Sequence, residues 1–285
     1  MPGPNAIVVA KTIRPSSLES GISANAKFEP TTRATKTATV AMVRVLSTKA
    51  GLSIQTISRP RKARLASTDY RRLANQSPVV RELSSFMKTA AAGGRGPSPS
   101  FTRAHFLLAF LTIGTSGLIG RQALAREAGL GEGAARTVLK RLREGGYVEV
   151  NASGAYLSKK GKGLLMILRG RLLPLVHLER SRLTVGNEQS AVGVRGGGRR
   201  LGNGILQRDS AIMVGATGAT TYSIRGSKFT IPGESTDCEK DYPSTVWKLL
   251  RKKLVPKGGD VVIVCGAEEE LKARLGALSA ALTLL

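Results

Sequence analysis

Three basic side chains recur along one stretch of the chain at a spacing that places them on a single helical face. Arg136, Lys140 and Arg143 are separated by four and then three residues, which brings them to the same side of an α-helix. Guanidinium and ammonium groups in such a row donate hydrogen bonds to phosphate oxygens, and those near a helix start reach acceptors on base edges. The chemistry that this spacing predicts is contact with a nucleic acid.

Other polar residues nearby are expected to extend this interface. We expect Arg136 to contact a base and Lys140 to contact a phosphate or a base, while the basic residues before this row contact the backbone. The tip of a following hairpin is expected to reach the minor groove or a phosphate. An alternative is a solvated basic face without a partner. The candidate DNA-contacting residues are Arg121, Arg126, Arg136, Thr137, Lys140, Arg143, Asn151 and Ser153.

These side chains depend on two short helices and a hairpin that the sequence predicts around them. Residues 121–128 have the apolar spacing of a helix, and Gly129 follows where a left-handed backbone ends it. Residues 134–144 predict a second helix, 147–157 a β-hairpin, and Ser158 the cap of a further helix. The second helix has one apolar stripe, formed by Ala135, Val138, Leu139 and Leu142.

This order of elements resembles the winged helix-turn-helix domains of archaeal and bacterial transcription regulators. The segment L-S-K-K-G after the hairpin resembles the L-T-x-x-G found at the last helix of such domains. Residues 117–148, joined to the segment QRDSAIMVGATGATT, are similar to an archaeal family of winged-helix proteins with an uncharacterised C-terminal domain. The positions that match the helix-turn-helix pattern are Ala125, Gly129, Leu130, Ala135 and Val138.

The resemblance covers about residues 97–285 and implies a role as well as a fold. It implies that the second helix reads double-stranded DNA and that the protein acts as a transcription regulator. Winged helices usually bind near-palindromic sites as pairs, so a homodimer is expected.

The charge of the chain agrees with a polyanionic partner. The net charge is +25, from 44 Lys and Arg against 19 Asp and Glu. Residues 1–95 hold sixteen basic and four acidic residues, net +12, residues 96–186 hold fourteen and five, net +9, and the remainder is net +4. Such a field favours DNA or RNA, and membrane surfaces less specifically. The alternative is a coat of solubilising charges.

Cysteine usage and hydropathy exclude several classes of protein. Cys238 and Cys265 have no other Cys or His nearby, which argues against a disulfide scaffold or a zinc site and indicates a cytoplasmic location. The apolar run at 106–113 is too short to span a bilayer, and the one at 164–175 is interrupted by two arginines. The first residues hold too short an apolar run for a signal peptide. No membrane association is therefore expected.

Three regions are expected, in a protein of the α+β class. Residues 1–96 predict a largely disordered basic tail, with a transient strand at 40–46 or a short helix at 70–74 or 79–88. This tail either adds non-specific DNA affinity or is translated from a wrongly chosen start, for which Met42 and Met87 are alternatives. Residues 97–183 predict the winged helix-turn-helix, including helices at 103–114 and 161–173. Residues 184–285 predict a small α/β domain for sensing or dimerisation.

The last helix of the winged helix-turn-helix is apolar nearly all round, so it must bury two surfaces, the second against the C-terminal domain or another subunit. In the C-terminal domain we expect strands at 190–195, 211–214, 220–225, 228–231 and 260–265, and helices at 199–208, 245–254 and 268–282.

Two glycine-rich loops, at 195–200 and 215–221, are candidates for a ligand site. A glycine loop between a strand and a helix exposes backbone N–H groups to an anion, and the first loop also contains arginines. Together the loops are expected to frame a small phosphorylated or acidic effector. The alternative is two tight turns and a helix cap. The candidate ligand-binding residues are Arg195, Gly197, Arg199, Arg208, Asp209, Thr217 and Gly218.

No pattern predicts a cofactor, a metal or a catalytic group. Asp237, Glu239 and Asp241 alternate as in a calcium loop, but the required glycine and final glutamate are absent. His105 and His177 lie in different regions and are expected to be packing or surface residues, so no catalytic triad is expected. The expected function is a regulator rather than an enzyme. The alternatives are an enzyme acting on a nucleotide-like or phosphorylated small molecule, and a non-specific architectural protein.

Overall fold

The computed structural model describes residues 46–48, 51–53, 78–91 and 99–285. Strands β1 (Leu46–Thr48) and β2 (Gly51–Ser53) pair antiparallel and belong to a separate unit. The helix expected at 70–74 lies outside the described residues, as does the strand expected at 40–46 except for its last residue. Everything described from residue 78 onward belongs to one unit.

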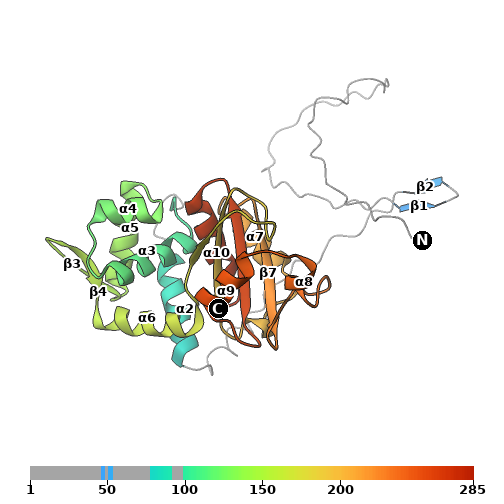
Figure 1. Cartoon of the computed structure of the whole chain (residues 1–285). Helices are drawn as coiled ribbons and strands as arrows, with labels where there is room; N and C mark the ends of the chain where they lie inside the picture. Colours follow the sequence, from blue (N-terminus) through green and yellow to red (C-terminus); the bar gives the residue numbers. More distant parts are fainter. Residues whose placement is uncertain (1–45, 49–50, 54–77, 92–98) are drawn as a thin grey trace, which may run out of the picture. The chain divides into compact units, whose positions relative to one another are not determined.

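The first part of this unit is helical and contains one hairpin (Figure 1). The helix and hairpin segments expected between 97 and 173 are present, with ends shifted by a few residues. Ser158 caps its helix as expected, because its Oγ accepts a hydrogen bond from the Gly161 N–H at 3.0 Å. The elements are α2 (Pro78–Ala91), α3 (Arg103–Ser116), α4 (Arg121–Ala128), α5 (Glu132–Glu144), β3 (Val148–Asn151), β4 (Gly154–Leu157) and α6 (Lys159–Arg171).

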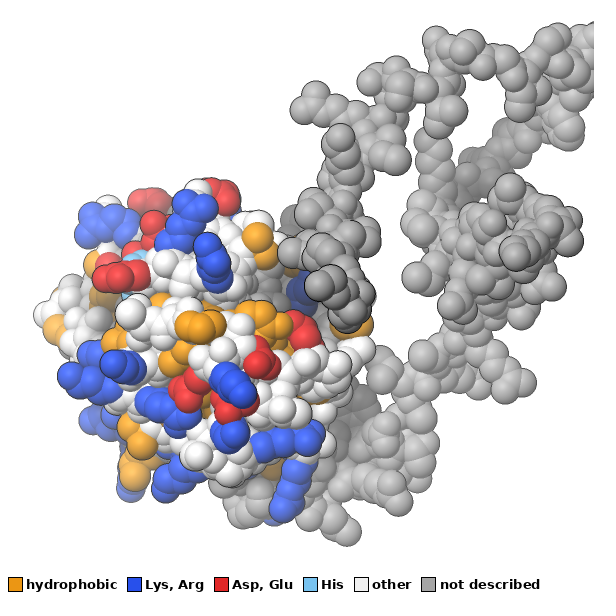
Figure 2. Space-filling view, turned by 45° about the vertical axis from the view of Figure 1, so that its right-hand side comes forward, with side chains coloured by type: hydrophobic (Ala, Val, Ile, Leu, Met, Phe, Trp, Pro, Cys, Tyr) orange, Lys and Arg blue, Asp and Glu red, His pale blue; other side chains and the backbone are white. Residues whose placement is uncertain are grey.

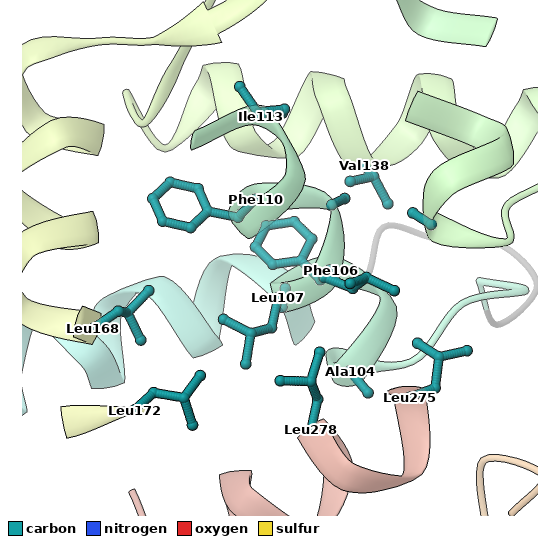
Figure 3. Packing of buried hydrophobic residues seen from close by; sticks show 14 of the residues in the cluster. Ala104, Phe106, Leu107, Phe110, Ile113, Val138, Leu168, Leu172, Leu275 and Leu278 are labelled. Carbon is teal, nitrogen blue, oxygen red and sulfur yellow. The ribbon is translucent and has the colours of Figure 1, made fainter. Parts of the chain in front are cut away.

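Helix α3 lies at the centre of this part. Thr102 and His105 form a capping box at its start, with 2.8 Å between Thr102 Oγ1 and His105 Nδ1, and partial burial lowers the pKa of His105. The helix carries apolar residues on every side, so it needs neighbours on every side. Figure 3 shows Phe106, Phe110 and Ile113 of α3 surrounded by side chains of other helices.

Helix α2 changes the expected boundary of the folded region. The segment was assigned to the basic tail, with a short helix at 79–88 as one option, and the structure has a helix of 14 residues there. Phe86 is fully buried, with its ring 5.1 Å from that of Phe106 and 4.9 Å from that of Phe110. The folded part therefore begins before residue 97, because α2 covers a face of α3 that would otherwise meet water.

The second part is a five-stranded sheet with helices on both faces. The strand order is β5-β6-β9-β7-β8, and every neighbouring pair is antiparallel. The elements are β5 (Val176–Leu178), β6 (Glu188–Val194), the 3-10 turn η1 (Gly197–Arg199), α7 (Ile205–Ile212), β7 (Gly218–Arg225), β8 (Lys228–Thr230), α8 (Cys238–Asp241), α9 (Val246–Leu254), β9 (Val261–Ala267) and α10 (Glu270–Leu282).

Strand β9 is the central strand and is buried on both faces. Alternate residues point to opposite sides, so that Ile263 and Cys265 pack with α7 and α10, while Val262 and Val264 pack with Trp247 of α9. Burial raises the pKa of the Cys265 thiol to about 12. The unit is therefore α+β, with the sheet held between two helical layers.

Two expected elements of this part are wrong. The helix expected at 199–208 is a short 3-10 turn followed by a break, and α7 begins only at Ile205. The reason is Gly204, which has a φ of +83° that an α-helix does not allow. The strand expected at 211–214 is instead the end of α7 and the turn after it, and Ala211 packs close to Gly276 of α10.

Helix α10 joins the two parts into one hydrophobic core. Leu275 and Leu278 lie next to α3 (Figure 3), and both are buried. Leu168 of α6 and Leu172 just after it belong to the same core, while Leu173 packs against the far face of the sheet. Helix α6 itself packs on α2, α3 and β4, so α2 covers a surface that was expected to meet the C-terminal domain or another subunit. Among the described residues, no helix combines the length and apolar character needed to cross a bilayer.

Candidate nucleic-acid interface

A tight turn sets the angle between α4 and α5. Gly129 adopts a left-handed conformation, with φ of +63° and ψ of 38°, and the next N–H, of Leu130, donates to the Ala125 carbonyl at 2.8 Å. A side chain at this glycine would also overlap Leu271 of α10. The left-handed backbone favours glycine here, so the turn fixes how α5 is presented.

Helix α5 separates a buried stripe from an exposed basic row, as expected. Ala135, Val138, Leu139 and Leu142 are buried. Arg136, Lys140 and Arg143 are exposed on the other side. Lys140 Nζ lies 3.8 Å from a carboxylate oxygen of Glu144, but both side chains are well exposed and such a pair is weak. Within the described parts of the chain, no carboxylate lies within ion-pair distance of the two arginines.

The remaining interface candidates divide into free and occupied groups. Arg121 and Arg126 are exposed on α4, and Ser153 is exposed at the hairpin tip. The hydroxyl of Thr137 donates to the Gly133 carbonyl of its own helix at 2.9 Å. Asn151 Oδ1 accepts from the N–H groups of Ser153 and Gly154 and so closes the hairpin turn. Thr137 and Asn151 therefore have structural contacts that the spacing did not predict.

Two basic residues in this region serve packing instead. Arg141 Nη1 donates to the carbonyl of Ala90 in α2 at 2.7 Å, and its guanidinium lies over the Phe101 ring at 5.1 Å. Lys160 Nζ donates to the Gly145 carbonyl and lies 4.2 Å from the centroid of the Tyr147 ring. Part of the local positive charge thus holds the fold together. Figure 2 shows Lys and Arg side chains dispersed over the visible face with acidic groups between them, so total charge alone does not define an interface.

The hairpin is bonded to the residue before α4 and across its own two strands. Ile119, just before α4, exchanges two backbone hydrogen bonds with Ala155 of β4, at 3.0 and 2.8 Å. The Tyr156 hydroxyl donates to Glu149 Oε2 across the strands at 2.8 Å, and this bond raises the pKa of Tyr156. The hairpin tip and the start of α4 are consequently held as one surface.

The candidate ligand residues do not form one site. The first glycine loop follows Val194, which pairs with Val261, whereas Gly218 pairs with Gly266 near the other end of β9. At about 3.4 Å per residue the two loops are about 17 Å apart. The expectation that they frame one ligand is wrong, because the sheet order inserts β9 between β6 and β7 and places the loops at opposite ends of it.

The candidate ligand residues differ in their surroundings: some are bonded or buried and others are exposed. Arg195 Nη1 bonds to the carboxylate of buried Asp260 at 2.6 Å. Arg208 and Asp209 are exposed on α7, Thr217 is exposed in the second loop, and Gly218 is buried at the start of β7. Gly197 is buried under the first loop. Arg199 is the candidate that lines a cavity.

The acidic loop that resembled a calcium site is used for internal contacts. Asp237 pairs with Lys228 at 2.7 Å, and the hydrogen bond from this lysine lowers the pKa of Asp237. Glu239 pairs with Arg251 at 2.8 Å, and Asp241 accepts a hydrogen bond from Ser235. Each carboxylate thus has a partner within the protein. Among the residues with described positions, no group of three His, Cys, Asp or Glu is arranged to hold a metal.

Residues 185–284 match a family described as a domain of unknown function, DUF4443. The chain is also similar to a solved structure of a hypothetical protein from the archaeon Pyrococcus horikoshii, with 23% sequence identity and a TM-score of 0.53. That similarity covers 65% of this chain and 93% of the other chain. No curated protein matches the chain. The structural match shows a shared fold.

Two glycines of α6 give a direct test of how the hairpin is seated. A side chain at Gly161 would overlap the carbonyl oxygen of Tyr147 at the base of the hairpin, whereas one at Gly163 would meet nothing within 4 Å. We expect Gly161→Ala to destabilise the protein by about 1–3 kcal/mol, and Gly163→Ala to stabilise it by up to about 1 kcal/mol through helix propensity. Urea denaturation of both variants checks this. Equal effects would show that α6 does not press against the hairpin.

Proposed function

We propose that this protein is a DNA-binding transcription regulator and that α4, α5 and the β3–β4 hairpin form a winged helix-turn-helix. The observation that carries the proposal is the exposed row of Arg136, Lys140 and Arg143 on α5, opposite its buried stripe. A row of this kind fits the major groove of double-stranded DNA, with its first residues near base edges and the later ones near phosphates.

The surroundings of α5 support this assignment. The turn at Gly129 sets the angle between α4 and α5, both of which keep an exposed polar face, and the hairpin tip carries Ser153 and the Asn151 amide. Arg121 and Arg126 of α4 are available for phosphate contacts. These positions correspond to the roles of recognition helix, wing and backbone-contacting helix.

The C-terminal α/β part is assigned to sensing or dimerisation. Because α10 shares one core with α3, a change in the sheet region alters the packing beneath α4 and α5. A small-molecule effector would then shift the population between forms with different affinity for DNA. We propose a homodimer, since paired readers suit near-palindromic sites. We assign no catalytic step to the chain.

Binding to the DNA upstream of the protein's own gene tests the proposal. In fluorescence anisotropy at low salt, we expect specific binding that weakens steeply as salt rises, because neutralised phosphates release counterions. Arg136→Ala is expected to weaken it by about 1–3 kcal/mol. Arg208→Ala removes an exposed arginine on α7 and serves as the control with matched charge.

Two results would contradict the proposal. The first is no binding to this DNA at low salt, and the second is an Arg136→Ala variant that binds as tightly as the Arg208→Ala control. Equal affinity for unrelated duplexes would instead indicate an architectural protein, because a specific regulator binds its own site far more tightly than other DNA.

A further inference from the structure

A cavity of about 640 Å³ lies at the end of the sheet where β6 ends and β9 begins. Its lining includes two glycine-rich loops, at 196–198 and 258–259. A volume of this size is typical of sites for small molecules. The arginines that line it are Arg171, Arg199, Arg200 and Arg225.

Glycine suits the loops at 196–198 and 258–259, because their backbones approach closely and turn through positive φ angles. The Gly198 N–H donates to the Gly259 carbonyl at 3.0 Å, and a side chain at Gly198 would lie only 3.0 Å from the same oxygen. Gly196 and Gly259 have positive φ angles of 62° and 88°. Backbone therefore approaches backbone here, and the cavity is lined by main chain and by long basic side chains.

The acidic group in this lining is already neutralised. Asp260 is buried, and its carboxylate accepts hydrogen bonds from Arg195 Nη1 and from the N–H groups of Gly196 and Lys257, at 2.6, 3.0 and 2.8 Å. It therefore does not oppose the approach of an anion. Within the described residues, none of the four lining arginines forms an ion pair with a side-chain carboxylate.

Arg171 and Arg200 are held in place by the fold. Arg200 Nη1 donates to the carbonyls of Leu284 and Leu285. Arg171 is only partly exposed, and its Nε is buried with no hydrogen-bond partner among the described residues. Because this Nε has almost no accessible surface, a ligand in the cavity meets only the other nitrogens of the Arg171 guanidinium.

We propose that this cavity binds a phosphorylated small molecule and that it is the effector site of the protein. The effector role rests on the regulator function proposed above. Arginines gathered around one hollow recognise phosphate oxygens through charge-assisted, often bidentate hydrogen bonds. Several arginines favour a ligand with more than one negative charge, such as a diphosphate group.

The position of the cavity favours a small ligand over the backbone of bound DNA. Helix α6 begins against the hairpin and ends at Arg171, which lines the cavity. Its thirteen residues extend about 20 Å, so the cavity lies far from the hairpin base. It is also a hollow at a sheet end, not an extended basic groove.

The same position connects the cavity to the DNA-contacting elements. The Arg195 N–H donates to the Arg171 carbonyl at 2.8 Å. The next residue, Leu172, pairs with Val194 at the end of β6. A ligand that contacts both Arg171 and Arg199 spans the joint between α6 and β6. Since α6 also packs on α3 and the hairpin, the ligand acts on the element that seats the hairpin.

Calorimetric titration of the full chain with inorganic pyrophosphate, at constant ionic strength, tests this inference. We expect saturable binding to the wild-type protein and a Kd about tenfold or more higher in both Arg199→Ala and Arg225→Ala. Both residues are exposed, so the variants are expected to fold. Arg208→Ala, which removes an exposed arginine outside the cavity, is expected to bind like the wild type.

The outcomes separate this site from the proposed function. Absence of pyrophosphate binding, or equal loss in Arg208→Ala, overturns the site even if the wild-type protein binds DNA. Competition between a short DNA duplex and pyrophosphate, lost in Arg199→Ala, also overturns it, since the cavity would then hold nucleic-acid phosphate. Pyrophosphate binding that leaves DNA affinity unchanged removes the effector role, and pyrophosphate binding without DNA binding supports the site while contradicting the regulator.

Discussion

Replacing Phe86 by alanine is expected to lower the free energy of unfolding by about 3–5 kcal/mol. Phe86 is fully buried in α2, and its ring lies within 5.2 Å of the rings of Phe106, Phe110 and Tyr147, measured between centroids. Truncation removes all three aromatic contacts and leaves a cavity that the surrounding helices fill only partly. The loss reaches α3, which forms the centre of the core.

Chemical denaturation followed by circular dichroism measures this loss. Ser84→Ala is the matched control, because Ser84 is exposed on the same helix and such surface changes stay within about 0.5 kcal/mol. If the two variants unfold at the same denaturant concentration, α2 does not pack on α3. A large difference establishes that residues 78–91 belong to the folded protein.

The same helix shows where the sequence was insufficient. Leu83, Phe86 and Ala90 are three and four residues apart, a helical pattern visible in the sequence. The pattern is short and lies in a basic, Ser- and Thr-rich region, so composition favoured a tail. Its burial depends on α3, whose apolar residues exceed what α4, α5 and α6 cover, and that demand appears only once the helices are assembled.

Local signals predicted the other elements with varying success. Gly129 and Ser158 mark helix ends by their own backbone and side-chain chemistry, so their elements were predicted closely. The helix expected at 199–208 was wrong because Gly202, Asn203 and Gly204 interrupt it, and Gly204 has a positive φ. The following apolar run was assigned to a strand, although Ala211 packs against a helix that lies far away in the sequence.

The candidate sites followed the same division between local and long-range information. The exposed row on α5 could be predicted because it depends only on helix periodicity. The separation of the glycine-rich loops at 195–200 and 215–221 could not be predicted, since it depends on β9 pairing between β6 and β7. Nor could the spacing show that Arg141 would bond to Ala90, because that partner lies in a helix assigned to the tail. The arginine-lined cavity likewise brings Arg171 and Arg225 together from distant segments.

Removing the Asp260 carboxylate is expected to destabilise the protein by about 3–5 kcal/mol. Only 6% of its side chain is exposed, and it accepts three hydrogen bonds, including one from Arg195 at 2.6 Å. In Asp260→Ala the Arg195 charge remains half-buried, with the Val255 carbonyl as its other acceptor, and two backbone N–H groups lose theirs. A buried charge left without its partner costs more than the pair gained by forming.

A second ion pair with the same N–O distance of 2.6 Å serves as the control, because Lys272 and Glu269 are 45% and 63% exposed. Water solvates both groups in that pair, so Lys272→Ala is expected to change stability by less than about 1 kcal/mol. Urea denaturation of both variants gives the comparison. Similar small losses would show that the loops around Asp260 open to solvent and that its carboxylate does not hold them. A large loss confined to Asp260→Ala would show that burial, and not the N–O distance, makes the Arg195–Asp260 pair important for fixing the loops at 196–198 and 258–259.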